Sequence, residues 1–196
     1  MARVVALSGA HGTGKSTLVE ELSKDPRCIC IDSVTRTNTT QAERRIDGVE
    51  DLDQTQLSIL KAIGEKVREI RELKRTLPDD KIIVLDRSYV DFYAYCKNFL
   101  VKNLIRHKTF EFVELKFYDL TRYIDCFFYL PIQFNIVDDG VRSLDTDLQQ
   151  GVDRVIREQL FKVGRTVELT GTVKDRLGRI NRTLDILNEK HTIYGL

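Results

Sequence analysis

Residues 9–16 read GAHGTGKS and fit the pattern G-x-x-x-x-G-K-(S/T). The apolar run VVAL at residues 4–7 precedes them, and residues 16–23 that follow are predicted to be helical. A short apolar run without polar alternation is typical of a strand that is buried on both faces of a parallel sheet. The pattern therefore lies between a strand and a helix, which is the setting in which such a loop binds phosphate. A glycine-rich turn without a ligand is the alternative, and this context disfavours it.

A loop that binds polyphosphate must direct its backbone N–H groups at oxygen atoms, and glycine permits the close approach and the backbone angles this requires. We expect Lys15 to reach the β- and γ-phosphates of ATP and the Ser16 hydroxyl to ligate Mg²⁺. The helix that begins near Ser16 would direct its positive end at the anion. His11 is interpreted as a structural member of the loop. The predicted ATP-binding residues are Gly9, His11, Gly12, Thr13, Gly14, Lys15, Ser16 and Thr17.

The rest of the chain repeats the alternation of strand and helix. Four further short apolar runs are predicted to be strands, at residues 28–31, 82–85, 126–130 and 167–169. Segments with helical periodicity or length separate or follow them, at residues 52–75, 89–106, 152–162 and 173–187. Five strands that alternate with helices predict a parallel α/β sheet. We find no repeat or linker, so residues 1–196 are expected to form one domain.

Composition excludes some classes of protein. The 196 residues include 31 lysines and arginines against 30 aspartates and glutamates, so no overall charge attracts the chain to nucleic acid or an anionic membrane. No run approaches the roughly 20 apolar residues of a membrane span. We expect a soluble, cytoplasmic protein without a membrane partner, located in the host cytoplasm if a virus encodes it. The cysteines lie in apolar surroundings and are predicted to be reduced core residues: Cys28, Cys30, Cys96 and Cys126.

Two carboxylates follow predicted strands. Asp86 ends the run at residues 82–86, where it would hold Mg²⁺ through a water molecule; its alternative role is that of a helix cap. Asp32 follows the second strand and is the candidate base for an attacking hydroxyl, with Arg36 placed to hold an acceptor phosphate. Both could instead be turn residues.

The segment after Asp86 brings further candidates for acceptor binding. Arg87, Tyr89 and Phe92 lie near the expected mouth of the sheet, and the aromatic residues have ordinary core packing as their alternative. With Asp32 and Arg36 they complete the predicted substrate-binding set.

A polar segment around residues 136–150 is predicted to form a lid over the phosphates. Arg142 within it is the candidate that offsets charge on the phosphoryl group during transfer, so that the predicted catalytic residues are Lys15, Asp32 and Arg142. Arg154 and Arg157 are expected to form surface ion pairs instead. The turn at residues 170–173 is a weaker candidate for contact with the adenine of ATP.

These segments together resemble P-loop kinases such as the ribosylnicotinamide-kinase domains of bacterial NAD-biosynthesis regulators and, more distantly, thymidylate and deoxynucleoside kinases. The resemblance rests on the loop at 9–16, Asp32 with Arg36, LDRS at 85–88, DGVR at 139–142 and LTG at 169–171. It implies a three-layer P-loop NTPase fold with a parallel sheet in the order 2-3-1-4-5, helices on both faces and a lid. It also implies an ATP–Mg²⁺ site and an acceptor pocket between Asp32, Asp86, Arg87 and the lid. The family often carries glutamate where this chain has Asp32.

Three functions compete. The first is a kinase that transfers the γ-phosphate of ATP to a nucleoside or nucleotide. The second transfers it to a hydroxyl of DNA, either a terminus or a hydroxymethylated base such as 5-hydroxymethyluracil. Basic side chains that could contact DNA phosphates, or form only a solvated face, are Lys97, Lys102, Arg106, His107, Lys108, Arg44 and Arg45.

The third hypothesis is a nucleotide-hydrolysing switch. The sequence lacks the guanine-specifying pattern N-K-x-D and an obvious water-positioning glutamine, and the lid-like segment favours transfer. Kinases of this size are often dimers, so a homodimer is one expected assembly.

Overall fold

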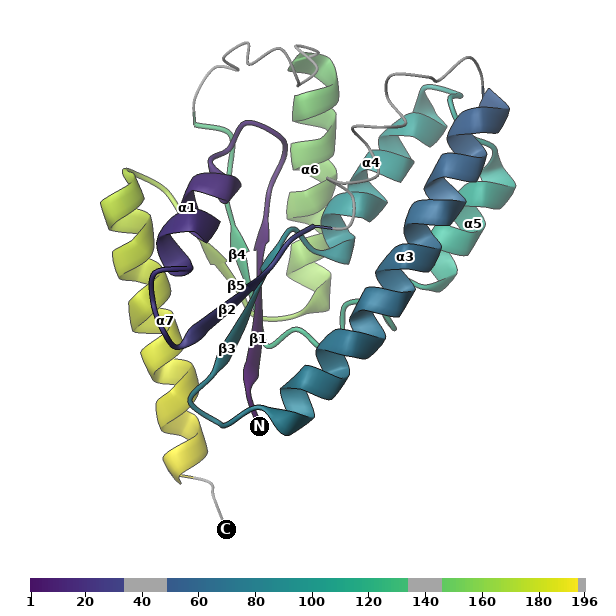
Figure 1. Cartoon of the computed structure of the whole chain (residues 1–196). Helices are drawn as coiled ribbons and strands as arrows, with labels where there is room; N and C mark the ends of the chain where they lie inside the picture. Colours follow the sequence, from purple (N-terminus) through teal and green to yellow (C-terminus); the bar gives the residue numbers. More distant parts are fainter. Residues whose placement is uncertain (34–48, 134–145, 194–196) are drawn as a thin grey trace.

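The computed structural model describes residues 1–33, 49–133 and 146–193 of the chain. Its centre is a five-stranded parallel sheet in the order β2-β3-β1-β4-β5, as predicted (Figure 1). The strands are β1 (Arg3–Ser8), β2 (Cys28–Ile31), β3 (Ile82–Asp86), β4 (Cys126–Tyr129) and β5 (Thr166–Glu168). Each falls within two residues of a predicted apolar run, because a strand covered on both faces must be apolar throughout.

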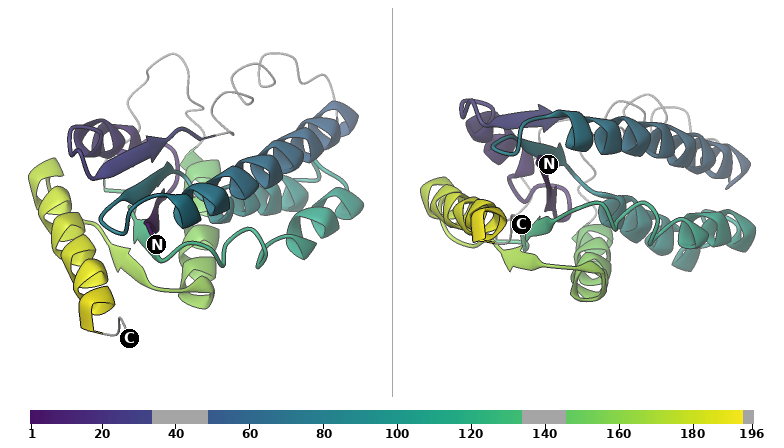
Figure 2. Two further views of the ribbon diagram at one scale, coloured as in Figure 1. Left: turned by 60° about the horizontal axis from the view of Figure 1, so that its bottom comes forward. Right: turned by 90° about the horizontal axis from the view of Figure 1, so that it is seen from below.

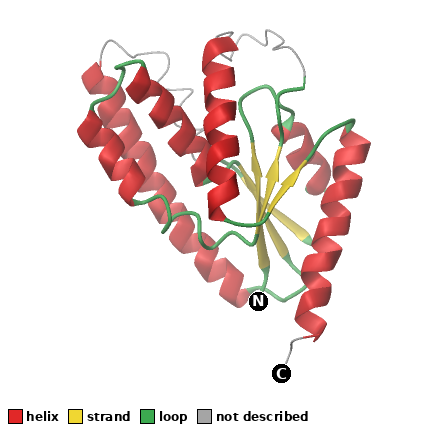
Figure 3. Ribbon diagram, turned by 180° about the vertical axis from the view of Figure 1, so that it is seen from behind, coloured by secondary structure: helices red, strands yellow, loops and turns green. Residues whose placement is uncertain are grey.

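Helices cover both faces of this sheet. Two pack on one face, namely α1 (Lys15–Leu22) and α7 (Val173–Ile193). The opposite layer consists of α3 (Val49–Thr76), α4 (Tyr89–Val101), α5 (His107–Leu115) and α6 (Thr146–Val163). Figure 2 shows α5 outside the sheet, against α3 and α4, and Figure 3 shows the sheet between the two helical layers. The three-layer arrangement matches the predicted fold class.

The central strand β1 shows why this fold buries so much apolar surface. Val5 and Leu7 point into the core shared with α1 and α7, whereas Val4 and Ala6 point into the core on the opposite face. All four side chains are completely buried. Because successive side chains of a strand alternate between faces, one apolar run supplies two cores.

Two predicted boundaries were wrong. Helix α4 ends at Val101 rather than near residue 106, because Asn103 adopts left-handed backbone angles, with φ of 56°, that interrupt the helix before α5. The separate helix α5 was not predicted. Helix α6 begins at Thr146, so the last five residues of the predicted lid are helical. Residues 134–145, with Arg142, and residues 34–48, with Arg36, lie outside the described part of the chain.

Two other expectations concern the whole chain. All four cysteines are free thiols, as predicted, and Cys96 and Cys126 are buried. Burial raises the pKa of Cys28 to about 11, which keeps this thiol protonated near neutral pH. Among the described residues, none of the helices is both long and apolar enough to cross a membrane.

Candidate active site

The glycine-rich loop joins β1 to α1 at the carboxyl edge of the sheet. Gly12 and Gly14 have φ angles of 77° and 89°, which L-residues with a side chain rarely adopt. A Cβ atom on Gly9 would lie 2.5 Å from the carbonyl oxygen of Leu130, closer than real atoms approach. The glycines of the pattern are therefore each required by local geometry, two by backbone angle and one by the close approach of Leu130, the residue after β4.

The ammonium group of Lys15 lies inside the arch of this loop. It donates hydrogen bonds to the carbonyl oxygens of Gly9 and Ala10, at 2.6 and 2.5 Å, and lies 3.3 Å from the hydroxyl oxygen of Thr13. The side chain is 5% exposed. The predicted phosphate-binding lysine thus lies at the centre of the loop, next to the half-buried Ser16 and the exposed Thr17.

Two buried side chains from the distal half of the chain hold the outer carbonyl groups of the loop. Gln149 on α6 donates to the carbonyl oxygen of His11 at 2.7 Å, and Arg176 on α7 donates to that of Thr13 at 2.8 Å. Neither contact was predicted from the sequence. A usable signal existed for Gln149, because it shares the apolar face of α6 with Val152 and would otherwise be an unexplained polar residue there.

Asp86 is the last residue of β3 and lies beside Leu7 of β1 in the sheet, just before the loop begins. Its side chain is 3% exposed. The alternative interpretation of Asp86 as a helix cap is wrong, because Ser88 caps α4 and accepts a hydrogen bond from the backbone of Val90. Asp86 therefore lies where a metal-shell carboxylate is expected, at the end of the strand beside the one that enters the loop.

A third carboxylate, Asp91, completes the capping box of α4 and also reaches the loop. Its Oδ2 accepts hydrogen bonds from the backbone N–H of Ser88 at 2.9 Å and from the Ser88 hydroxyl at 3.1 Å. Its Oδ1 accepts from the backbone N–H of Gly9, also at 2.9 Å. The spacing S-x-x-D after β3 is the signal that predicts the capping box, but the contact to Gly9 has no sequence signature.

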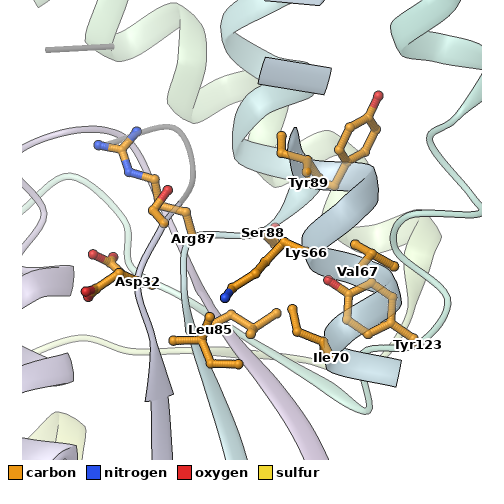
Figure 4. A pocket seen from close by; sticks show the side chains of 13 residues that line it. Asp32, Lys66, Val67, Ile70, Leu85, Arg87, Ser88, Tyr89 and Tyr123 are labelled. Atoms are coloured by element: carbon orange, nitrogen blue, oxygen red, sulfur yellow. The ribbon is translucent and has the colours of Figure 1, made fainter. Parts of the chain in front are cut away.

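The ends of β2 and β3 face helix α3 across a shared pocket (Figure 4). The structure brings together four of the predicted site residues here: Asp32, Asp86, Arg87 and Tyr89. Lys66 extends into the pocket from α3, and the remaining wall is largely apolar, with Val67, Ile70 and Tyr123 among its residues. The carboxylate of Asp32 and the guanidinium group of Arg87 therefore line the same pocket, which combines these charged groups, Asp86 and Lys66 with an apolar wall.

Arg87 has an unusual backbone for a residue with a side chain, with φ of 82°. Its N–H donates to the carbonyl oxygen of Leu7 at 3.1 Å, and its guanidinium carbon lies 5.8 Å from the ring centroid of Tyr95. The Tyr95 hydroxyl in turn lies 3.0 Å from Nδ1 of His11. His11, which was predicted to have a structural role in the loop, thus contacts Tyr95, whose ring lies against Arg87.

The two predicted aromatic site residues differ. The Tyr89 hydroxyl donates to the carbonyl oxygen of Val113 at 2.7 Å, and burial raises its pKa. Phe92 is 3% exposed and packs against the Tyr89 ring, with the centroids 5.6 Å apart. Phe92 is not among the residues that line the pocket. Its position agrees with the alternative of core packing.

The sequence was compared with known protein families and with curated proteins. The sequence matches a family model described as "AAA domain" over residues 4–176. The chain belongs to this AAA-domain family. A search of curated protein sequences gave no significant match.

Solved structures share the fold of this AAA-domain protein. Deoxyadenosine kinase from M. mycoides with the products dCMP and dCDP is 16% identical with a TM-score of 0.69, over 93% of this chain and 98% of that one. The NadR protein in complex with NR is 18% identical with a TM-score of 0.67, over 100% of this chain and 52% of that one. The AAA-domain protein therefore has a P-loop kinase-like fold, which confirms the resemblance found in the sequence.

Other predicted residues of the AAA-domain protein have contacts of their own. Arg106, a candidate for DNA contact, donates its backbone N–H to Asp53 at 2.9 Å, and its Nε lies 3.5 Å from the same carboxylate. The Arg157 guanidinium lies over the ring of Tyr129, 5.7 Å from the centroid. The Gly171 N–H donates a hydrogen bond to the Gln133 side chain at 3.2 Å. This bond connects the turn after β5 to the segment that follows β4. Arg44 and Arg45 lie outside the described residues.

Proposed function

We propose that this protein is an ATP-dependent kinase that transfers the γ-phosphate of ATP to a nucleoside or nucleotide-type acceptor. The observation that carries the proposal is the pocket in which Asp32 and Arg87 lie together beside Asp86. Asp86 is paired in the sheet with the strand that enters the glycine-rich loop, so the pocket adjoins that loop. A hydrolytic switch needs only the loop and a positioned water, whereas a kinase needs a second pocket for the group that receives the phosphate.

The loop would bind the triphosphate through its backbone N–H groups and the positive end of α1. In this binding step, phosphate oxygens would replace the carbonyl oxygens of Gly9 and Ala10 as acceptors for Lys15. The residues that could hold Mg²⁺ are Ser16 and Asp86, which offer a hydroxyl and a carboxylate oxygen. In the described part of the chain no group of three or more potential ligands gathers. The Ser16 hydroxyl and the Asp86 carboxylate fit Mg²⁺, which proteins usually hold through one or two carboxylates together with substrate phosphates. The ion would neutralise negative charge on those phosphates.

In the transfer step, the acceptor hydroxyl oxygen forms a bond to the γ-phosphorus while the bond from that phosphorus to the bridging oxygen of ADP breaks. Asp32 would take the proton of the hydroxyl. Arg87 would hold the acceptor and offset negative charge near it. Its left-handed backbone costs on the order of 1–3 kcal/mol, a cost that is found mostly where a side chain must be aimed for function. Arg36 and Arg142 remain proposed partners in this step. We also propose that residues 1–196 form one kinase domain.

The similarity to solved structures that contain a nucleotide or nucleoside supports a nucleoside or nucleotide-type acceptor. The deoxyadenosine kinase structure contains dCMP, and the NadR structure contains NR. A polynucleotide acceptor shares the same chemistry, but none of the contacts described above favours it.

In the test, the purified protein is incubated with MgATP and one candidate acceptor, and ADP formation and labelled product are measured. The acceptors are nucleosides, nucleoside monophosphates, nicotinamide riboside and oligonucleotides that carry hydroxymethylated bases. We expect fast ADP formation with at least one nucleoside or nucleotide and slow hydrolysis without an acceptor. Transfer only to oligonucleotides would replace the acceptor class with DNA. Rapid hydrolysis that no acceptor accelerates would overturn the kinase proposal in favour of a switch.

A further inference from the structure

Asp91 connects the two sides of the candidate site. It is 1% exposed and accepts hydrogen bonds from two backbone N–H groups that belong to different segments. One is that of Gly9, the first residue of the glycine-rich loop, and the other is that of Ser88, which directly follows Arg87. A single buried carboxylate therefore joins the segment expected to bind ATP to the segment that presents Arg87.

The connection is short and reinforced. Each of the two N–H donors lies 2.9 Å from its own carboxylate oxygen. The Ser88 hydroxyl adds a bond of 3.1 Å to Asp91 and lies 2.8 Å from the hydroxyl of Ser8, the last residue of β1. Hydrogen bonds to an ionised acceptor are stronger than neutral ones, and burial removes the competition of water. The spacing between Gly9 and Ser88 is thus set by the width of one carboxylate.

A helix cap alone does not need this arrangement. A capping box at the start of α4 requires Ser88 and a side chain at the third helical position that returns to the Ser88 N–H, and glutamate or glutamine usually supplies it. Asp91 uses only Oδ2 for that purpose. Its second oxygen is directed at the loop, where Gly9 has no room for a side chain because Leu130 lies against it.

We propose that Asp91 is a positioning residue, which sets the distance between the bound ATP and the acceptor held by Arg87. The proposal rests on the kinase function proposed above. Phosphoryl transfer is sensitive to the alignment of its two reactants, and a displacement of about 1 Å can lower a rate by as much as 100-fold. The loop has separate contacts to Gln149 and Arg176, so its grip on ATP does not depend on Asp91 alone.

The discriminating variant is Asp91→Glu. Glutamate retains the charge and suits a capping box, but its additional methylene in a fully buried site moves the carboxylate relative to Gly9. We expect a melting temperature lowered by only a few degrees, because the buried site must accommodate the methylene. The Kd for MgATP should stay within about threefold, and kcat should fall by about tenfold or more. The Gly9 amide proton should move in the ¹H–¹⁵N spectrum of the full chain, because its acceptor has moved.

Two further variants control the result. Asp91→Asn cannot accept from both N–H groups, so it should lower kcat and move the Gly9 or Ser88 amide resonance upfield. Asp125→Asn changes the carboxylate that accepts from the Val4 N–H at the other end of β1, at 2.8 Å. It should move the Val4 resonance and lower the melting temperature while kcat of the folded protein stays unchanged. If Asp91→Asn does not fold, Asp91→Glu still decides the question.

A wild-type kcat in Asp91→Glu, together with a moved Gly9 resonance, would show that Asp91 is only a helix cap and would overturn the proposal. An unmoved Gly9 resonance in both Asp91 variants would overturn the hydrogen-bonded connection itself. If the parent protein phosphorylates no acceptor, the kinase function fails and the positioning role fails with it, whereas the amide resonances still report whether the connection exists.

Discussion

The two ends of β1 are each held by a carboxylate, but the surroundings of the two groups differ. At the amino end, Asp125 accepts from the Val4 N–H and forms an ion pair with Lys74, whose ammonium nitrogen lies 2.7 and 2.9 Å from its oxygens. At the carboxyl end, Asp91 accepts from the Gly9 N–H and is otherwise bonded to the N–H and hydroxyl of Ser88. One carboxylate is paired with a cation and the other is bonded to neutral donors.

Under the proposed function, this difference separates a contact that serves stability from contacts that serve the site. At the amino end, opposite charges satisfy one another, and Lys74 also donates to the carbonyl oxygen of Tyr123 at 3.2 Å. At the carboxyl edge, Lys15 lies inside the loop and Arg87 lines the pocket, where the proposed function would bring bound phosphates and an acceptor to these two cations. Helix dipoles and strand ends meet at this edge, which is why parallel α/β folds place their ligands there.

The largest expected effect comes from Lys15 at the carboxyl edge. Replacing it in Lys15→Ala removes the cation from the centre of the loop, and removal of such an electrostatic group typically costs about 100- to 1000-fold in kcat. The fold should persist, because the loop retains its contacts to Gln149 and Arg176. Turnover and a thermal melt check this prediction. A variant with more than a tenth of the parent kcat would contradict the proposed phosphate contact.

Asp32→Asn should have the next largest effect. The amide cannot take the proton of the acceptor hydroxyl, so kcat should fall by about 100-fold, the typical contribution of a general base. The Kd for MgATP, measured by calorimetry, should stay within about twofold, because Asp32 lines the pocket rather than the loop. Unchanged turnover would remove Asp32 from the role of base.

At the amino end, Asp125→Asn tests the opposite behaviour. The variant leaves the half-buried Lys74 ammonium without its ion-pair partner, and we expect the free energy of unfolding to fall by about 2 kcal/mol. Urea denaturation measures this change. The kcat of the folded variant should equal that of the parent. A loss of kcat comparable to that in Asp32→Asn would show that the two ends of β1 are not separate in function.

The sequence was most informative where one physical requirement dominates. Buried strands must be apolar, and the loop must contain glycine, so the sheet order, the loop and the alignment of Asp32 with Asp86 were predictable from local patterns and resemblance. The interruption after α4 was not predictable, because it depends on one left-handed residue, Asn103, within an otherwise helical composition.

Contacts between distant segments were the other failure. Gln149 and Arg176 reach the loop from the far half of the chain. The apolar face of α6 marks Gln149 as a polar residue that needs a partner, but nothing near either residue identifies the loop as that partner. Asp91 carries a recognisable capping pattern, yet its second oxygen bonds to a residue 82 positions away. Local patterns report the bonds within an element, whereas bonds across elements depend on the tertiary packing that brings the partners together.

The smallest expected effect concerns the support of Arg87. Tyr95→Phe removes the hydroxyl that lies 3.0 Å from the His11 ring but retains the aromatic face beneath the guanidinium. Loss of one hydrogen bond should lower stability by about 1 kcal/mol, and kcat should change less than about threefold.

Tyr95→Leu is the matched control, because it also removes the aromatic face, and a cation–π contact contributes about 1 kcal/mol to holding the cation. If the ring positions Arg87 for the acceptor, Tyr95→Leu should raise the acceptor KM more than Tyr95→Phe does, with the Kd for MgATP unchanged in both. Equal acceptor KM values in the two variants would assign the ring to packing, and Arg87 would then depend for its orientation on its backbone and on the segment that Asp91 holds.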